Sequence, residues 1–183
     1  MSILKFGFDR DICIGCAACE VACKTANGVP HGTRRRRVIT VERGEYPAVE
    51  KYFVSMGCMH CTIPACERAC PVKAIFKRED GIVLHDKDKC IGCGYCGWAC
   101  PFGAPQYPHD LPADLKEYEG IMDKCTFCVV PFKQEKDANG VIIQSEPKPS
   151  CATSCTTKAL NAGDIREMTT QERAARSLIE VQV

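Results

Sequence analysis

The sequence lacks the marks of several common function classes. Neither sign of charge predominates, because 24 Lys and Arg residues are balanced by 23 Asp and Glu residues, which gives a formal net charge of +1. This balance argues against a nucleic-acid-binding protein, which usually carries a strong basic excess. The sequence also has no phosphate-binding glycine loop, no nucleotide fingerprint and no Ser/His/Asp arrangement that stands out. We therefore expect no nucleic-acid partner and no catalytic residue in this protein.

Long hydrophobic runs are missing as well. Residues 1–10 contain no apolar stretch of signal-peptide length, and no run approaches the roughly 20 apolar residues that a membrane-spanning helix needs. We expect a cytoplasmic protein with no membrane segment of its own. Association with a membrane through a partner, or folded export on a partner that carries the signal, is compatible with the same observation.

Cysteine is the residue in excess. The 183 residues include 16 cysteines, against 7 Phe and 1 Trp. Such a composition leaves two broad classes, a disulfide scaffold or a metal protein. Because the cytoplasm keeps thiols reduced, metal ligation is the stronger interpretation.

The cysteines fall into four groups of four, and none is left over. The first and third groups are spaced C-x2-C-x2-C-x3-C, the second C-x2-C-x4-C-x3-C and the fourth C-x2-C-x22-C-x3-C. In sequence order the groups are Cys13, Cys16, Cys19 and Cys23; Cys58, Cys61, Cys66 and Cys70; Cys90, Cys93, Cys96 and Cys100; and Cys125, Cys128, Cys151 and Cys155.

The spacing decides between zinc and iron–sulfur clusters. A structural zinc site normally uses two C-x2-C pairs separated by a longer loop, and only the fourth group fits that description comfortably. Three cysteines at steps of three place three thiolates on one tight loop, which suits a cubane whose irons lie at separate corners, while the fourth cysteine points to a second cluster. Pro71 and Pro101 directly follow the second and third groups and complete the bacterial ferredoxin signature.

The order of the groups predicts an α+β fold of short strands, small helices and long loops. Residues 58–101 form a complete two-cluster ferredoxin, in which a hairpin around Asp80-Gly81 joins two motifs. The first and fourth groups flank this unit, and the economical solution is that they pair with each other. We therefore expect two nested bacterial-ferredoxin-like units: an outer unit of residues 1–50 plus 110–183, and an inserted unit of residues 51–109.

Short elements are predicted around these motifs. Residues 4–8, 37–42 and 51–55 read as strands, and the last two pair across residues 44–47. Residues 134–149 are expected to form a surface excursion with a turn at Asn139-Gly140 and a short strand over residues 141–143. A capping box over residues 169–172 is expected to open a C-terminal helix that continues to about residue 179.

Several stretches carry a family resemblance. They are residues 8–16 (FDRDICIGC), 58–66 (CMHCTIPAC), 77–81 (KREDG), 88–93 (DKCIGC) and 100–107 (CPFGAPQY). With four ferredoxin-type groups in this order, the protein resembles the electron-transfer (beta) subunits of dimethyl sulfoxide reductase-type molybdenum and tungsten oxidoreductases. The resemblance runs from about residue 6 to residue 165.

The resemblance implies four 4Fe–4S clusters held by crossed ligand sets. Set A would be Cys13, Cys16, Cys19 and Cys155; set B would be Cys23, Cys125, Cys128 and Cys151; set C would be Cys58, Cys61, Cys66 and Cys100; and set D would be Cys70, Cys90, Cys93 and Cys96. It also implies a non-catalytic subunit that conducts electrons between a molybdenum or tungsten bis-pterin catalytic subunit and another redox partner. That second partner would be a quinone-reactive membrane subunit, a flavin subunit or a ferredoxin.

Two other functions remain open on the sequence alone, a freestanding polyferredoxin shuttle and a zinc-stabilised interaction module. The remaining residues add three further expectations. The basic run Arg34–Arg37 is either a solvated edge or a source of positive charge that docks a partner or raises a cluster potential. His60 lies inside a ligand loop and could tune its cluster. Tyr95 and Trp98 are expected to pack against the cluster between whose ligands they lie.

Overall fold

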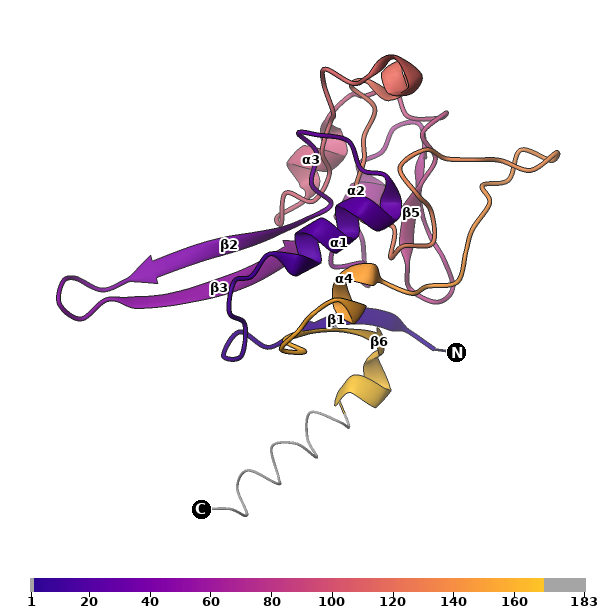
Figure 1. Cartoon of the computed structure of the whole chain (residues 1–183). Helices are drawn as coiled ribbons and strands as arrows, with labels where there is room; N and C mark the ends of the chain where they lie inside the picture. The colour runs from indigo at the N-terminus through magenta and orange to yellow at the C-terminus, as the bar shows by residue number, and fades with distance from the viewer. Residues whose placement is uncertain (1, 170–183) are drawn as a thin grey trace.

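Three separate antiparallel strand pairs and several short helices make up residues 2–169, which the computed structural model describes (Figure 1). The strand pairs are β1 (Leu4–Phe8) with β6 (Leu160–Asp164), β2 (Arg36–Arg43) with β3 (Glu50–Gly57), and β4 (Ile75–Lys77) with β5 (Val83–His85). The helices are α1 (Ala18–Asn27), α2 (Ala65–Arg68), α3 (Tyr95–Ala99), α4 (Ser150–Thr153) and the 3₁₀ helix η1 (Ala113–Tyr118). The predicted α+β character with short elements is confirmed.

The pair β1–β6 joins the two ends of the described region. Its register runs from Leu4 opposite Asp164 to Phe8 opposite Leu160. The predicted strand over residues 4–8 is therefore confirmed. Because β6 directly follows the fourth cysteine group, this pairing holds the last cysteines beside the loop that carries the first ones (Figure 1).

The β2–β3 hairpin projects from the body of the molecule (Figure 1). The predicted pairing across residues 44–47 is confirmed, and each strand is longer than predicted, with Arg36 opposite Gly57 and Arg43 opposite Glu50. The hairpin contacts the loop of the first cysteine group, where the Phe53 ring lies against Gly15. A Cβ atom at Gly15 would stand 2.5 Å from that ring, and φ at Gly15 is +70°, so only glycine fits this ligand loop.

The β4–β5 hairpin forms as predicted from its turn residues. Arg78 N donates to Ile82 O at 2.8 Å, and Gly81 N donates to Arg78 O at 3.0 Å. Gly81 adopts φ +86°, a conformation that residues with a side chain rarely adopt. The Asp80 carboxylate closes the turn by accepting from Ile82 N at 3.2 Å and by pairing with Arg78 at 2.6 Å.

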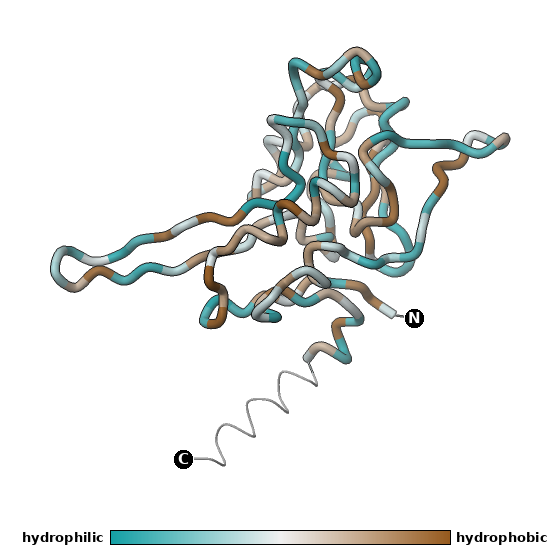
Figure 2. The backbone as a smooth tube through the Cα atoms, viewed as in Figure 1, coloured by the Kyte–Doolittle hydropathy of each residue, from teal (hydrophilic) through white to brown (hydrophobic). Residues whose placement is uncertain are grey.

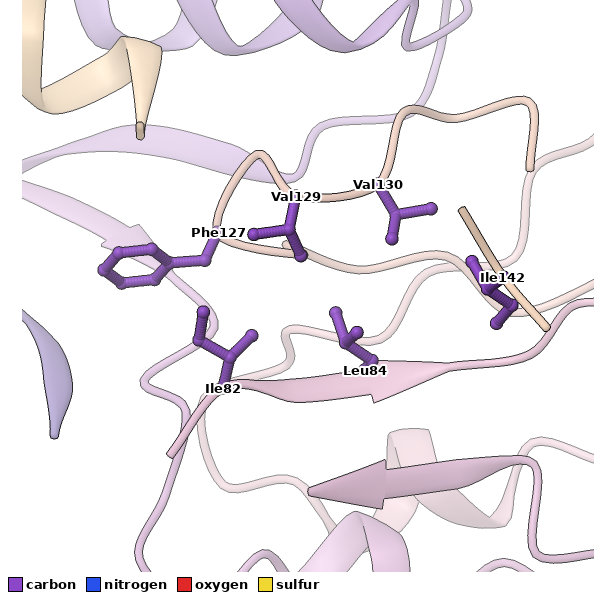
Figure 3. Close-up of a cluster of buried hydrophobic side chains, with 6 residues drawn as sticks. All are labelled: Ile82, Leu84, Phe127, Val129, Val130 and Ile142. Carbon is purple, nitrogen blue, oxygen red and sulfur yellow. The ribbon is translucent and has the colours of Figure 1, made fainter. Parts of the chain in front are cut away.

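The apolar core is divided into several small clusters. Figure 2 shows hydrophobic residues scattered along the backbone in short stretches rather than gathered in one long one. The largest cluster without cysteine lies between β5 and the loop that follows Cys125, and its side chains face one another across that space (Figure 3). It consists of Ile82, Leu84, Phe127, Val129, Val130 and Ile142. Since three further clusters contain cysteines, the thiols themselves occupy core positions.

The excursion over residues 134–149 extends away from the body, as predicted (Figure 1). The predicted strand over residues 141–143 is wrong, because only an isolated bridge between Lys136 and Ile142 forms. One side chain anchors the segment: Ile142 is 7% exposed and packs into the core, whereas Val141 and Ile143 are more than half exposed. A strand needs a continuous partner, and a narrow loop that returns on itself does not supply one.

The C-terminal helix begins earlier than the capping box predicted. Residues 165–169 are already helical, and the Thr169 hydroxyl donates to Ile165 O at 2.7 Å, so Thr169 lies inside the helix. Asp164 takes the capping role instead, because its carboxylate accepts from Arg166 N at 2.8 Å. The remainder of the predicted helix lies outside the described residues. Over the described part of the protein, no helix is long and apolar enough to cross a membrane.

A buried ionic network ties the middle of the sequence together. The Asp123 carboxylate is fully buried, accepts two hydrogen bonds of 2.8 Å from Arg35 and lies 3.2 Å from Lys87 Nζ. Burial alone would raise the pKa of Asp123, but the charge and hydrogen bonds of Arg35 hold it well below its usual range. His85 lies 3.6 Å from the same carboxylate, and burial lowers the pKa of its imidazole to about 4, so His85 stays neutral at pH 7.

Asp123→Asn is expected to destabilise the cluster-loaded protein strongly. The change leaves Arg35 as a buried cation without a counter-charge, a loss that typically costs about 3–5 kcal/mol. The midpoint of anaerobic guanidinium unfolding measures the effect. Glu146→Ala serves as the control, because it breaks an ion pair with Lys148 in which both side chains are more than three-quarters exposed, and no measurable shift is expected. An Asp123→Asn midpoint equal to that of the native protein would show that the network is not stabilising.

Candidate iron–sulfur cluster sites

All sixteen cysteines lie in the described part of the protein, and all are free thiols. The family resemblance implied that they act together in four crossed sets rather than as four contiguous groups. The positions of the side chains bear directly on this prediction, because a crossed set draws on cysteines that are far apart along the sequence.

The set A cysteines line one cavity. The residues around about 330 Å³ of empty space include Cys13, Cys16, Cys19 and Cys155, which come from the loop before α1, from α1 itself and from the turn before β6. The local sequence produces this arrangement, because Ala17 adopts φ +58° and ends the ligand loop so that α1 begins at Ala18. The cavity therefore brings a cysteine of the fourth group to three cysteines of the first.

Two further cavities of about 310 Å³ each bring together the cysteines of sets C and D. The walls of one contain Cys58, Cys61, Cys66 and Cys100, and the walls of the other contain Cys70, Cys90, Cys93 and Cys96. In both cases three cysteines come from one sequence group and the fourth comes from the other group.

The set B cysteines are also neighbours. Burial raises the pKa of the Cys23 thiol to about 12, and the nearby thiols of Cys151 and Cys128 contribute to that shift. Burial, followed by the proximity of Cys23, likewise raises the pKa of Cys125. The set combines the last cysteine of the first group with three cysteines of the fourth.

The four thiols of each cavity surround a volume rather than a point. In the described region, no group of three or more His, Cys, Asp or Glu side chains is arranged to hold a single metal ion. A structural zinc site requires four ligand atoms at about 2.0–2.3 Å from one centre. Thiols spread around some 310–330 Å³ instead suit a cubane, whose irons lie at separate corners.

The buried thiols would lose protons when they bind iron. Burial raises the pKa of Cys66 to about 11, above the ordinary value for a thiol, and it also raises that of Cys96. Because a metal binds the thiolate, loading these sites releases protons, and the positive irons supply the charge that stabilises the buried sulfur anions. The donor chemistry therefore fits an iron–sulfur cluster.

The particular groups that donate hydrogen bonds to the sulfurs were not predicted from the sequence. Asn27 Nδ2 donates to Cys128 Sγ at 3.3 Å, and the backbone N–H groups of Ala74, Phe127 and Leu160 approach cysteine sulfurs at 3.2–3.4 Å. Two hydroxyl groups also lie close, since Ser55 Oγ is 3.4 Å from Cys19 Sγ and the Tyr107 hydroxyl is 3.0 Å from Cys96 Sγ. Such donors tune the potential of a cluster, and cysteine spacing alone does not reveal them.

The basic run separates into residues with different environments. The solvated-edge interpretation holds for Arg34, whose side chain is 59% exposed, but it is wrong for Arg35 and Arg36, which are buried. Arg35 forms the ion pair with Asp123, while Arg36 faces cysteine sulfurs. The alternative that positive charge lies near the clusters therefore describes Arg36.

His60 is fully buried between the aromatic rings of Phe6 and Phe127. Its Nδ1 accepts from Val83 N at 3.0 Å, and burial lowers its pKa well below the ordinary value. The imidazole is thus a neutral packing group with one hydrogen bond. A lysine supplies the charge near set C instead, since Lys124 is buried and borders that cavity.

The expected packing of Tyr95 and Trp98 against a cluster is wrong. Trp98 is 93% exposed and Tyr95 is 62% exposed. Both stand on α3, where a separation of three residues places them on the same face, and that face is turned to solvent while Cys96 is buried. The loop spacing predicted where the ligands lie, but it did not predict which face of so short a helix is covered.

The four sets follow one another through shared buried clusters. Sets A and B meet where Cys19, Cys23 and Cys151 pack together, and α1 carries a member of each set one helical turn apart. Sets B and C meet where Cys125 packs with Cys58. Sets C and D meet in a cluster that includes Cys66, Cys70, Cys90 and Cys96.

Comparison with known proteins shows to which family the protein belongs. The family model of the 4Fe–4S dicluster domain matches residues 49–165. This protein belongs to that family. Among its relatives, the formate dehydrogenase iron-sulfur subunit of Wolinella succinogenes is 48% identical over 167 residues, which cover 88% of the present sequence and 81% of that subunit.

Two other relatives of the 4Fe–4S dicluster protein extend the comparison. A subunit of the sulfite dehydrogenase of Allochromatium vinosum is 37% identical over 91% of the present sequence and 71% of its own length. A component of the anaerobic dimethyl sulfoxide reductase of Escherichia coli is 38% identical over 90% and 76%, respectively. The predicted resemblance to the iron–sulfur subunits of dimethyl sulfoxide reductase-type oxidoreductases is confirmed. The protein is an electron-transfer subunit, not a catalytic one, and its sixteen cysteines match four 4Fe–4S clusters.

Proposed function

We propose that this protein conducts electrons between a catalytic subunit that holds a molybdenum or tungsten bis-pterin cofactor and a second redox partner. The observation that carries the proposal is the unbroken succession of cysteine sets A, B, C and D through shared buried clusters. A simple carrier needs one or two clusters, whereas a row of four suits conduction between distant sites. When bound, 4Fe–4S clusters supply one-electron oxidation and reduction.

We propose that the ligands are the four crossed sets. Support comes from the three cavities whose walls each contain the four cysteines of sets A, C and D, and from the mutual proximity of the set B thiols. In this arrangement Cys23 of the first group joins three cysteines of the fourth group, and Cys155 of the fourth group joins three cysteines of the first. Cys70 and Cys100 do the same between the second and third groups.

We also propose the nested organisation, with residues 1–50 and 110–183 as the outer unit and residues 51–109 as the inserted one. The β1–β6 pair and the packing of α1 on α4 support the outer unit, and the β4–β5 pair with α2 beside α3 supports the inner one. Ile82 and Leu84 of the inner unit pack with Val129 and Val130 of the outer one, so the two units would fold as one body (Figure 3).

The second redox partner is proposed to be a quinone-reactive membrane subunit, a flavin subunit or a ferredoxin. The names of the relatives support a catalytic partner, because the similar protein is in each case one component of a formate dehydrogenase, a sulfite dehydrogenase or a dimethyl sulfoxide reductase. We propose a cytoplasmic location, in solution or at the membrane through a partner, and export on the signal of a partner is the alternative.

Affinity purification from the native host under anaerobic conditions is expected to recover a stable complex. The expected eluate contains a larger subunit, molybdenum or tungsten with a pterin, and about 16 irons on this protein, four for each 4Fe–4S cluster. Fractionation of the same cells shows which compartment holds the complex. Recovery of this protein alone, with full electron-carrier activity and no molybdenum, tungsten or pterin, would instead favour the freestanding shuttle.

A further inference from the structure

A buried guanidinium lies between two of the cysteine sets without a carboxylate partner. Arg36, the first residue of β2, is 4% exposed. The two preceding arginines of the same run have acidic partners, Glu20 for Arg34 and Asp123 for Arg35, but Arg36 has none in the part of the protein that the structure describes. A buried charge without a counter-charge is strongly unfavourable, so the environment of Arg36 must supply negative charge in another form.

The guanidinium is held in place from three sides. Its Cζ lies 4.4 Å from the centre of the Phe6 ring, and its Nη1 donates to Ser55 Oγ at 3.1 Å. Gly57 stands opposite Arg36 in the β2–β3 register, and a Cβ atom at Gly57 would be 3.3 Å from Arg36 Nη2. The glycine therefore leaves room for the guanidinium to lie across the hairpin.

Cysteine sulfurs provide the missing negative charge. Phe6, whose ring lies against the guanidinium, packs on the buried cluster of Cys19, Cys23 and Cys151 and on that of Cys58 and Cys125. Burial alone would lower the pKa of Arg36, but the thiols of Cys151, Cys125 and Cys19 raise it above its ordinary value. Cys19 belongs to set A, whereas Cys125 and Cys151 belong to set B. Arg36 thus lies beside ligands of both sets, at the point where those sets meet.

Ser55 links the guanidinium to set A through two hydrogen bonds, and the donor of each can be assigned. Arginine can only donate, so Ser55 Oγ accepts from Arg36. A cysteine that binds iron is a thiolate without a proton, so at the 3.4 Å contact with Cys19 the sulfur accepts and the Ser55 hydroxyl donates. The positive charge therefore strengthens a hydrogen bond that ends on a ligand of set A.

We propose that Arg36 is the shared counter-charge of the clusters in sets A and B, and that it raises the reduction potentials of these two neighbours. The proposal rests on the ligand sets of the proposed function. A cluster gains negative charge when it is reduced, so a fixed cation beside it favours the reduced form. A single guanidinium beside both sets acts on both clusters in the same direction.

The potentials of an Arg36→Gln variant provide the test, measured by redox titration with electron paramagnetic resonance on the anaerobic, cluster-loaded protein. Each signal is first assigned from its loss in a single-cysteine variant of each set. At a fixed potential, the reduced-to-oxidised ratio of the clusters in sets A and B is expected to fall at least tenfold, which equals a shift of about 59 mV or more for a one-electron couple. The ratio for set D is expected to stay unchanged.

Three further variants make the outcome specific. Arg34→Gln removes the same charge from an exposed position two residues away, and no shift is expected. Arg36→Lys keeps the charge. The reduced-to-oxidised ratios of the clusters in sets A and B are therefore expected to stay within about threefold of their native values. Ser55→Ala keeps the guanidinium but removes the hydrogen bond to Cys19, so the potential of set A is expected to fall while that of set B remains.

Iron analysis separates failure of this inference from failure of the proposed function. Fewer than about 16 irons in the native protein would overturn the ligand sets and, with them, the role of Arg36. A native iron content together with unchanged potentials in Arg36→Gln, or with an equal shift of all four clusters, would overturn only the role of Arg36. If Arg36→Gln loses iron, the Ser55→Ala titration decides, and unchanged potentials in both sets would reject the proposal.

Discussion

Removal of the clusters with an iron chelator under anaerobic conditions is expected to unfold the protein. The far-ultraviolet circular dichroism should lose most of its native signal, and the remaining polypeptide should show no cooperative thermal transition. The physical reason is that the core consists of small separate clusters, three of which contain cysteine side chains. Binding of the metal then supplies much of the folding free energy.

The cavities add to this effect. Without the clusters, three cavities lined by cysteines lose the atoms that fill them, and unfilled space in a core lowers the stability of a fold. The buried thiols would also have to be protonated, as the raised pKa of Cys66 indicates.

Reconstitution provides the control for the chelation experiment. Addition of ferrous iron and sulfide to the stripped protein should restore both the brown colour and the circular dichroism, whereas addition of zinc should restore neither. A stripped protein with the native spectrum and a sharp melting transition would contradict the prediction, because it would show that the apolar clusters alone hold the fold.

The cysteine groups and both hairpins were predictable because their signals are local. Cysteines that follow one another at every third position imply one tight loop. Asp80-Gly81 between two short apolar runs implies a β-hairpin. Both kinds of signal involve residues within a few positions of one another. The β2–β3 pairing was found in the same way, since the strands are consecutive along the sequence.

The environment of the arginine run could not be predicted, because its partners are distant in the sequence. Arg35 finds its carboxylate 88 residues later, at Asp123, and Arg36 finds sulfurs at Cys125 and Cys151. Composition therefore left a solvated edge, where charged residues usually lie, and positive charge beside a cluster as alternatives, and it could not show which arginine takes which place. The exposure of Trp98 has a similar origin, because nothing in a one-turn helix specifies which face the rest of the protein covers.

The strand expected over residues 141–143 failed for a third reason. Val141, Ile142 and Ile143 have high strand propensity, but propensity measures how well a residue fits a pleated surface that already exists. Here only Ile142 reaches the core, and the loop offers one isolated bridge instead of a partner strand. Tertiary context thus selected one side chain as an anchor and left its two neighbours in solvent.

Replacement of Cys100 by alanine is expected to damage the cluster of set C and to spare that of set D. Cys100 follows Cys96 by four residues, yet its side chain lines the cavity of Cys58, Cys61 and Cys66. The iron content should fall from about 16 to about 12, or to about 15 if a three-iron cluster survives on the remaining thiols. The paramagnetic resonance signal of set C should disappear or change type, and the signal of set D should remain.

Cys70→Ala is the matched control, because Cys70 holds the reciprocal position. It ends the second sequence group but lines the cavity of Cys90, Cys93 and Cys96, so its loss should damage set D and spare set C. The two variants remove the same atoms from half-buried cysteines, and any general loss of stability would affect them alike. Crossed ligation therefore predicts opposite patterns from the pair. If Cys100→Ala instead removed the signal of set D, the ligands would follow the contiguous groups, and the row of clusters inferred from the cavities would have to be redrawn.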